Sequence, residues 1–183
     1  MINSAEIRLG NGSDTLSYEL TGAQFRHRIV IDTETGDDSV SLLASGVVGS
    51  VRIDTGVESD NVAIDLAAGS FLLHGLRVNT GVGDDSVLFH ADSDGGLPLL
   101  SGFSLIETAE GNDTVQFEGV FGALGSGLVV DLGAGDDMVI GDSETSLPEG
   151  RVECIGHAGH DTVLNASYFR SPFVLHLFET IED

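Results

Sequence analysis

Lysine is absent from this sequence of 183 residues, and the only 7 basic side chains, all arginines, face 30 aspartates and glutamates. The formal net charge of −23 argues against nucleic acid as a partner, because binding to phosphate backbones needs clustered basic residues. The absence of lysine also excludes a Walker-type phosphate loop and a Schiff-base lysine. Self-repulsion among the acids opposes a compact chain unless cations neutralise them.

Cysteine and long apolar runs are scarce as well. Cys154 is the only cysteine, which excludes an internal disulfide and a paired-cysteine metal knuckle. No stretch approaches the ~20 apolar residues of a membrane-spanning helix, so membrane insertion is not expected. The first residues lack the basic and apolar regions of a signal peptide, so any export would be signalled from elsewhere.

What is present is a repeat, aligned on an aspartate that recurs every 22 to 28 residues. The seven aspartates are Asp14, Asp38, Asp60, Asp85, Asp113, Asp137 and Asp161. An aliphatic residue follows each of them by two positions, and glycine precedes six of the seven by two positions, with Glu58 as the exception. Glycine there indicates a backbone that needs a positive φ or that lies close to another group.

Apolar residues alternate with a period of two on both sides of each aspartate, as at Ile29 and Ile31 before it and Val40 and Leu42 after it. This pattern predicts strands flanking a turn, and the repeat length predicts an all-β, right-handed parallel β-helix of about seven coils. An inward position seven residues before each aspartate is aliphatic except at Cys154. Residues 1–183 are expected to form one domain, interpreted as a fragment of a longer repeat protein because no polar cap is visible.

Four of the turns share a motif, written Thr35-Gly-Asp-Asp-Ser-Val40, Gly81-Val-Gly-Asp-Asp-Ser-Val87, Gly111-Asn-Asp-Thr-Val115 and Gly133-Ala-Gly-Asp-Asp-Met-Val139. It resembles the nonapeptide GGxGxDxUx of the RTX, or hemolysin-type, calcium-binding repeats. The resemblance implies Ca²⁺ held between stacked turns by carbonyls and aspartates of a secreted bacterial protein. Here the motif occurs once per coil, and threonine or leucine replaces its first glycine, so a wide β-helix with one RTX-like edge is expected.

Calcium chemistry supports the same interpretation, because Ca²⁺ takes six to eight oxygen ligands and acidic turns with converging carbonyls supply them. The predicted metal ligands are Asp14, Asp37, Asp38, Asp60, Asp84, Asp85, Asp113, Asp136, Asp137 and Asp161. In three of these turns two aspartates are adjacent, and a turn without a metal would need only one of them. The alternatives are metal-free corners in which aspartate caps backbone N–H groups, and a halophilic surface whose acids serve solvation.

Other residues form weaker constellations. Arg52 and Arg77 are equivalent and are expected to pair with acids on an outer face. Thr33, Thr55, Thr80 and Thr108 form a row that alternation directs inward, where hydroxyl hydrogen bonds explain them. His157 and His160 beside Asp161 are interpreted as exposed turn residues.

The predicted function is a calcium-binding structural or adhesive module of a secreted or cell-surface protein, with no catalytic residues. Carbohydrate and the neighbouring domains of a larger surface protein are the further partners considered. The alternatives are a polysaccharide lyase or epimerase built on a β-helix, and an ice- or carbohydrate-binding surface. An enzyme would place convergent polar groups near the irregular loops at 92–98 and 141–150.

Overall fold

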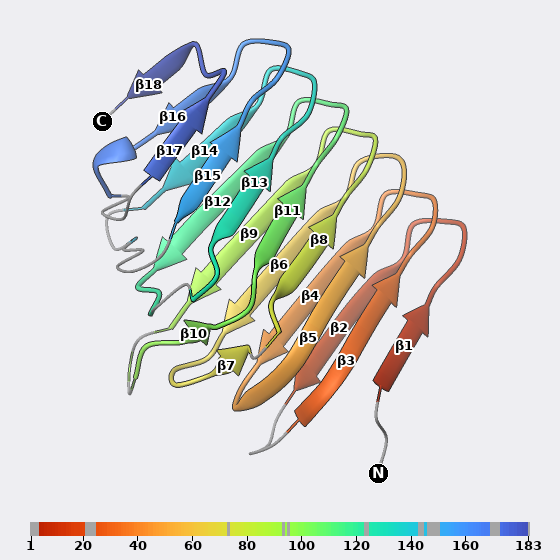
Figure 1. Cartoon of the computed structure of the whole chain (residues 1–183). Coiled ribbons are helices and arrows are strands. Elements are labelled where there is room, and N and C mark those ends of the chain that lie inside the picture. Colours follow the sequence, from red (N-terminus) through yellow and green to blue (C-terminus); the bar gives the residue numbers. More distant parts are fainter. Residues whose placement is uncertain are drawn as a thin grey trace.

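The structure is a computed structural model, and it describes residues 4–20, 25–72, 74–92, 94, 96–122, 125–142, 145, 151–168 and 173–182. Two parallel β-sheets run side by side along the whole molecule (Figure 1). Within the described ranges the one helical element is a short 3-10 helix, Ala166–Tyr168. The all-β prediction is confirmed.

The first sheet has ten strands, eight of which stack in chain order along the axis. These eight are β1 (Ser4–Arg8), β3 (Phe25–Asp32), β5 (Val47–Asp54), β8 (Leu76–Asn79), β11 (Ser104–Glu107), β13 (Leu128–Asp131), β15 (Val152–Ile155) and β17 (Phe173–His176). The short strands β7 (Phe71–Leu72) and β10 (Leu99–Leu100) extend this sheet beside β5.

The second sheet has eight strands, which also stack in chain order along the axis. They are β2 (Thr15–Leu20), β4 (Ser39–Ala44), β6 (Asn61–Leu66), β9 (Ser86–Ala91), β12 (Thr114–Gly119), β14 (Met138–Gly141), β16 (Thr162–Leu164) and β18 (Thr180–Glu182). Every strand pairs in parallel with its counterparts in the neighbouring coils, so the chain winds forward by one coil per repeat.

The coils stack in the register that the aspartate alignment predicts. In the second sheet Val115 pairs with Val87 and with Val139, and all three follow an aspartate by two positions. In the first sheet Ile53 pairs with Ile31 on one side and with the equivalent residue of β8 on the other. Equivalent residues therefore form columns along the axis, and the predicted parallel β-helix of about seven coils is confirmed.

The core is made of the inward columns of both sheets, because alternation along each strand buries every second side chain. Cys154 lies in one of these columns with no exposed surface, as predicted, and burial raises the pKa of its thiol. Phe89, Phe117 and Phe121 pack together in the middle coils, with ring centroids 4.9 to 6.3 Å apart. Such columns bury apolar surface at about 25 cal/mol per Å² and stabilise the stack.

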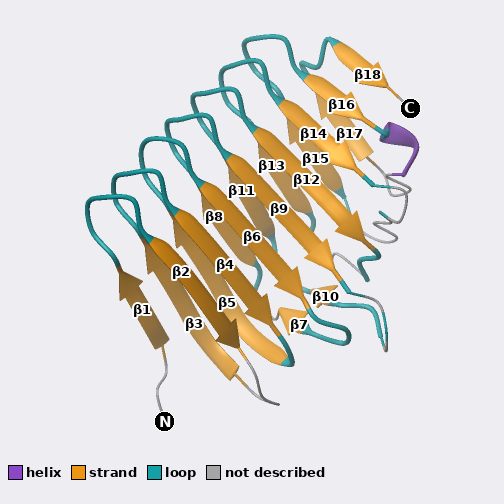
Figure 2. Cartoon of the chain, turned by 180° about the vertical axis from the view of Figure 1, so that it is seen from behind, coloured by secondary structure: helices purple, strands orange, loops and turns teal. Residues whose placement is uncertain are grey.

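The two edges of the solenoid differ. Along one edge, short turns of similar shape link the first sheet to the second, and these contain the aspartates (Figure 2). Along the other edge the links are longer and irregular, and they include β7, β10 and the segment before Leu99 with Pro98. Pro98 thus lies in a connection between the sheets, whereas Pro148 and Pro172 lie outside the described residues.

Candidate functional site

The aspartate turns place their acids in two rows. An aspartate such as Asp113 lies two residues before an inward aliphatic side chain, so alternation directs its carboxyl group inward, and it is buried. The residue just before it points outward, as the exposed Asp84 does beside Asp85. The inner row consists of Asp14, Asp38, Asp60, Asp85, Asp113, Asp137 and Asp161. The outer row consists of Asp37, Asp84 and Asp136, with Ser59, Asn112 and His160 at the equivalent positions of other coils.

Hydrogen bonds link the inner row from coil to coil. The backbone N–H of Asp85 donates to Oδ1 of Asp113, and the N–H of Asp113 donates to Oδ1 of Asp137, both at 2.8 Å. The same bond recurs between all successive members of the row, at 2.7 to 3.1 Å. Each carboxyl group from Asp38 to Asp161 thus caps a backbone donor of the preceding coil, and loss of one would leave that N–H without an acceptor.

Glu179 ends the inner row. Its Oε2 accepts the backbone N–H of Asp161 at 2.8 Å, in a turn that has no aspartate. A longer side chain here makes the contact that aspartate makes in the other coils. The sequence pattern does not reveal this residue, because Glu179 lies outside the glycine-aspartate motif.

The second oxygen of every inner-row carboxyl group has no partner. All seven Oδ2 atoms are buried and make no hydrogen bond. From Asp38 to Asp161 these side chains belong to residues at most 3% exposed. A buried carboxylate oxygen without compensation is costly, because water can no longer stabilise its charge. Seven such atoms in a column at the ~4.8 Å spacing of stacked strands form the main unexplained polar feature of the described residues.

The pKa values of the inner row reflect this burial. Loss of hydration raises the pKa of Asp113 to about 7 and the pKa values of Asp60 and Asp137 to about 6. Hydrogen bonds to the carboxyl groups oppose the rise, and neighbouring inner-row charges add to it. Burial likewise raises the pKa values of Asp85 and Asp161. These five carboxyl groups therefore favour protonation or the presence of a cation.

The outer row forms a second set of links, in which each aspartate accepts an N–H from the following coil instead of the preceding one. Oδ1 of Asp84 accepts the backbone N–H of Asn112 in the next coil at 2.8 Å, and Oδ1 of Asp136 accepts the N–H of His160 at 2.8 Å. Oδ1 of Asp37 accepts the N–H of Ser59 at 3.1 Å. Both acids of a pair therefore accept a backbone N–H of a neighbouring coil. Considered within one turn, the second acid has no such contact, and the stack of coils provides one; its role as a metal ligand stays a prediction.

The threonine row lies beside the inner row. Thr33, Thr55 and Thr108 are fully buried, and each hydroxyl donates to the carbonyl oxygen of the equivalent residue in the next coil, at 2.8 to 3.1 Å for Thr33 and Thr108. The inward direction predicted for this row is confirmed. Thr55 and Thr108 also lie close enough to the carboxyl groups of Asp60 and Asp113 to oppose the rise in their pKa values, although neither hydroxyl hydrogen-bonds the buried Oδ2 atom. The site therefore contains neutral hydroxyl oxygens as well as acids.

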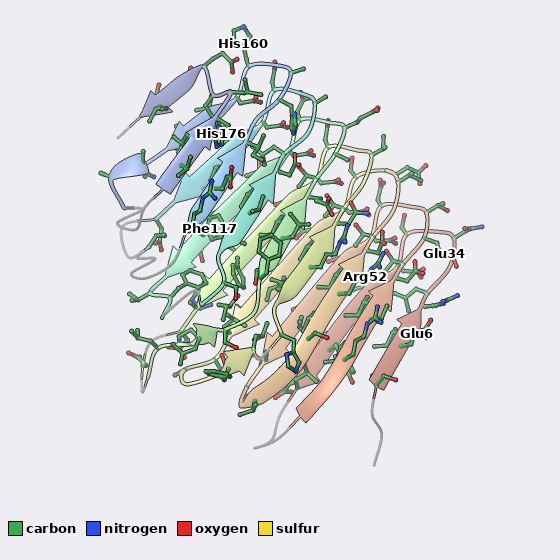
Figure 3. All side chains as sticks on the ribbon, viewed as in Figure 1. Glu6, Glu34, Arg52, Phe117, His160 and His176 are labelled. Carbon is green, nitrogen blue, oxygen red and sulfur yellow. The ribbon has the colours of Figure 1, made fainter. Side chains whose placement is uncertain are left out.

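The turns that depart from the motif still join the same rows. Glu58 replaces the glycine of the third turn and adopts a φ of 80°, and Asp60 two residues later remains buried and hydrogen-bonded. In the seventh turn His160, labelled in Figure 3, is exposed at the outer row as predicted. His157 is exposed as well, and its Nε2 lies 2.8 Å from Oδ1 of Asp131.

No three histidine, cysteine, aspartate or glutamate side chains within the described ranges form a group able to hold a metal by themselves. An acidic depression of about 320 Å³ lies beside the irregular loops, lined by His90, Asp92, Asp94, Glu118 and Asp142 among others. Oδ1 of Asp92 accepts the backbone N–H of Asp94 at 2.9 Å, which is a local loop contact. Most of the loop at 141–150 lies outside the described residues.

Within the described part of the chain, no helix has the length and apolar character needed to cross a membrane. No protein-family model matches the sequence, and no curated protein or solved structure matches it either. The assignment of a function therefore depends on the turn edge itself.

Proposed function

We propose that this chain is a calcium-binding structural module whose stacked aspartate turns become rigid when Ca²⁺ neutralises the inner row. The observation that supports this is the column of seven buried Oδ2 atoms without a partner. The RTX-like motif of the turns points to the same ion. Ca²⁺ prefers oxygen ligands, and this edge offers carboxylate, hydroxyl and carbonyl oxygens.

The residues that would hold the ions are those of the inner row, each with its neighbours in the adjacent turn. Since no three acids of the described ranges converge, an ion here would use one or two carboxylate oxygens and complete its shell with threonine hydroxyl and turn carbonyl oxygens. Bound Ca²⁺ supplies positive charge where burial now raises the carboxyl pKa values. Up to six ions between seven turns would add +12 and reduce the net charge of −23 to −11.

The role that fits these properties is a spacer or adhesive segment of an extracellular or cell-surface protein. Ion binding to the folded state alone stabilises it by RT ln(1 + [Ca²⁺]/Kd) per site, so a protein of this design is loose at low calcium and rigid at high calcium. Both acid rows already hold neighbouring coils together. A structural role therefore accounts for the acids without assigning them to catalysis, and we propose no enzymatic activity.

Isothermal titration calorimetry of calcium-free protein tests the site. We expect two to about six bound ions with Kd values of about 10⁻⁴ to 10⁻³ M, as in extracellular calcium modules, and no saturable binding of Mg²⁺ in that range. Asp113→Asn, which removes one inner-row charge, is expected to lower the number of bound ions by one or two. Asp92→Asn, an exposed loop acid, is the matched control and should leave the number unchanged. Equal losses in both variants, or no binding by the unmodified protein, would refute the proposal.

A further inference from the structure

The arginines whose side chains the structure describes gather on one surface. Five arginines have side chains that the structure describes. Arg8, Arg28, Arg52 and Arg77 lie on the outer face of the first sheet, and Arg151 immediately precedes its strand β15. Arg52 pairs in register with Arg77, as predicted, and its position on β5 is labelled in Figure 3. Four of the five, Arg8, Arg52, Arg77 and Arg151, pair with acids of the same face, and Arg28 has no acidic partner among the described residues.

A depression of about 350 Å³ lies among Arg28, Arg52 and Arg77, over β3, β5 and β8. None of its described lining residues is an aspartate or a glutamate, although acids outnumber arginines by 30 to 7 in the sequence. His74 also lines it and is exposed. The volume falls within the range of small-molecule sites.

The three guanidinium groups retain free donors. Arg52 pairs with Asp54 at 2.8 Å and Arg77 pairs with Glu107 at 2.7 Å, each through one nitrogen, so the expected ion pairs with acids are confirmed. Their side chains remain 43% and 51% exposed. Arg28 makes no hydrogen bond or ion pair with the described residues. A guanidinium group has five N–H donors in a planar fork that fits carboxylate, sulfate and phosphate oxygens.

The wall of the depression includes an exposed aromatic ring. Phe103 is 53% exposed, and with Leu105 it lines the same space as the arginines. An exposed phenylalanine beside cations offers an apolar face on which a sugar or aromatic ring can stack, while the charged group of the same ligand binds arginine. The acids outside the depression would repel a long polyanion, which favours a ligand with one acidic group.

We infer that this arginine depression, defined by Arg28, Arg52, Arg77, His74 and Phe103, binds a small ring-bearing oxyanion, such as an acidic monosaccharide. The acidic group binds Arg28, whose donors contact none of the described residues, with Arg52 and Arg77 beside it. The ring lies against Phe103. This site is separate from the turn edge and does not depend on calcium binding there.

Titration of the whole chain in calcium-containing buffer, followed by calorimetry, tests this inference with three probes. We expect D-glucuronate to bind saturably, and neutral D-glucose and inorganic sulfate to bind at least about tenfold more weakly, because each lacks either the charge or the ring. Arg28→Gln is expected to weaken glucuronate binding about tenfold or more with an unchanged melting temperature. Arg8→Gln, on the same face but outside the depression, should change it less than about twofold.

Three outcomes would overturn the inference. One is the absence of saturable glucuronate binding. Another is equal binding of glucose or sulfate, which would show that the ring or the charge alone is recognised. The third is an equal loss in Arg8→Gln and Arg28→Gln, which would show a general charge effect instead of a site. Failure of this test leaves the calcium titration of the turn edge unaffected, since the two use different residues.

Discussion

Replacing Gly111 with alanine is expected to lower the free energy of unfolding by about 3–4 kcal/mol, whereas the same change at Gly12 is expected to cost about 1 kcal/mol. Both glycines lie two residues before an inner-row aspartate, and their φ values are 144° and 115°. A β-carbon on Gly111 would overlap the carbonyl oxygen of Gly83 in the preceding coil, whereas one on Gly12 meets nothing within 4 Å. The difference between the variants therefore reports the close stacking of turns.

Urea unfolding of both variants, followed by far-UV circular dichroism, measures this difference. Glu58 shows how the turn accommodates a side chain at the equivalent position, because its φ falls to 80°. Relaxation of this kind limits the cost of Gly111→Ala. Equal destabilisation by the two substitutions would mean that φ strain alone matters and that the turns do not stack as tightly as described.

Calcium-free protein is expected to melt several degrees higher at pH 5 than at pH 8. Burial raises the pKa of Asp113 to about 7 and the pKa values of Asp60 and Asp137 to about 6, whereas the ordinary value is 3.8. Between pH 4 and pH 7 the folded state therefore holds protons that the unfolded state has released. Folding stability is greatest below the unfolded pKa and is lost as the pH rises through the folded values.

Thermal melting from pH 4 to pH 8 in a chelating buffer checks this dependence. Asp113→Asn should reduce the loss of stability between pH 5 and pH 8, because it removes a carboxyl group whose pKa is raised to about 7 and which therefore loses its proton within that interval. Asp92→Asn, exposed and outside the turns, is expected to follow the unmodified protein. A melting temperature that rises with pH in the calcium-free protein would contradict the conclusion that the inner-row carboxyl groups are buried without compensation for their charge.

Much of the fold was predictable because the repeat is aligned on single residues. A register error of one residue would turn every side chain to the opposite face, so Val87, Val115 and Val139 could be placed in one inward column from their spacing alone. The glycine before the aspartate was expected to allow either positive φ or close approach, and at Gly111 both are found. Cys154 was placed inside by the same alternation.

The site was predicted less completely. The residues of the turn edge were identified, but the division into a buried inner row and an exposed outer row was missed. The sequence does contain this information, because Asp113 lies two positions before the inward Val115 and alternation therefore directs both side chains inward. The hydrogen bonds between coils could not be read from one turn, because Asp113 caps a residue 28 positions earlier. The arginine depression depends on strand order, which places Arg28 and Phe103 near one another.

The most direct test of the account is the melting temperature of calcium-free protein at pH 8 as Ca²⁺ is added, with Mg²⁺ and sodium chloride as controls and a parallel series at pH 5. We expect a large rise specific to calcium at pH 8 and a smaller rise at pH 5, where protons already neutralise Asp60, Asp113 and Asp137. An unchanged melting temperature at pH 8 would contradict the account and leave a metal-free solenoid. An equal rise with sodium chloride alone would assign the effect to charge screening.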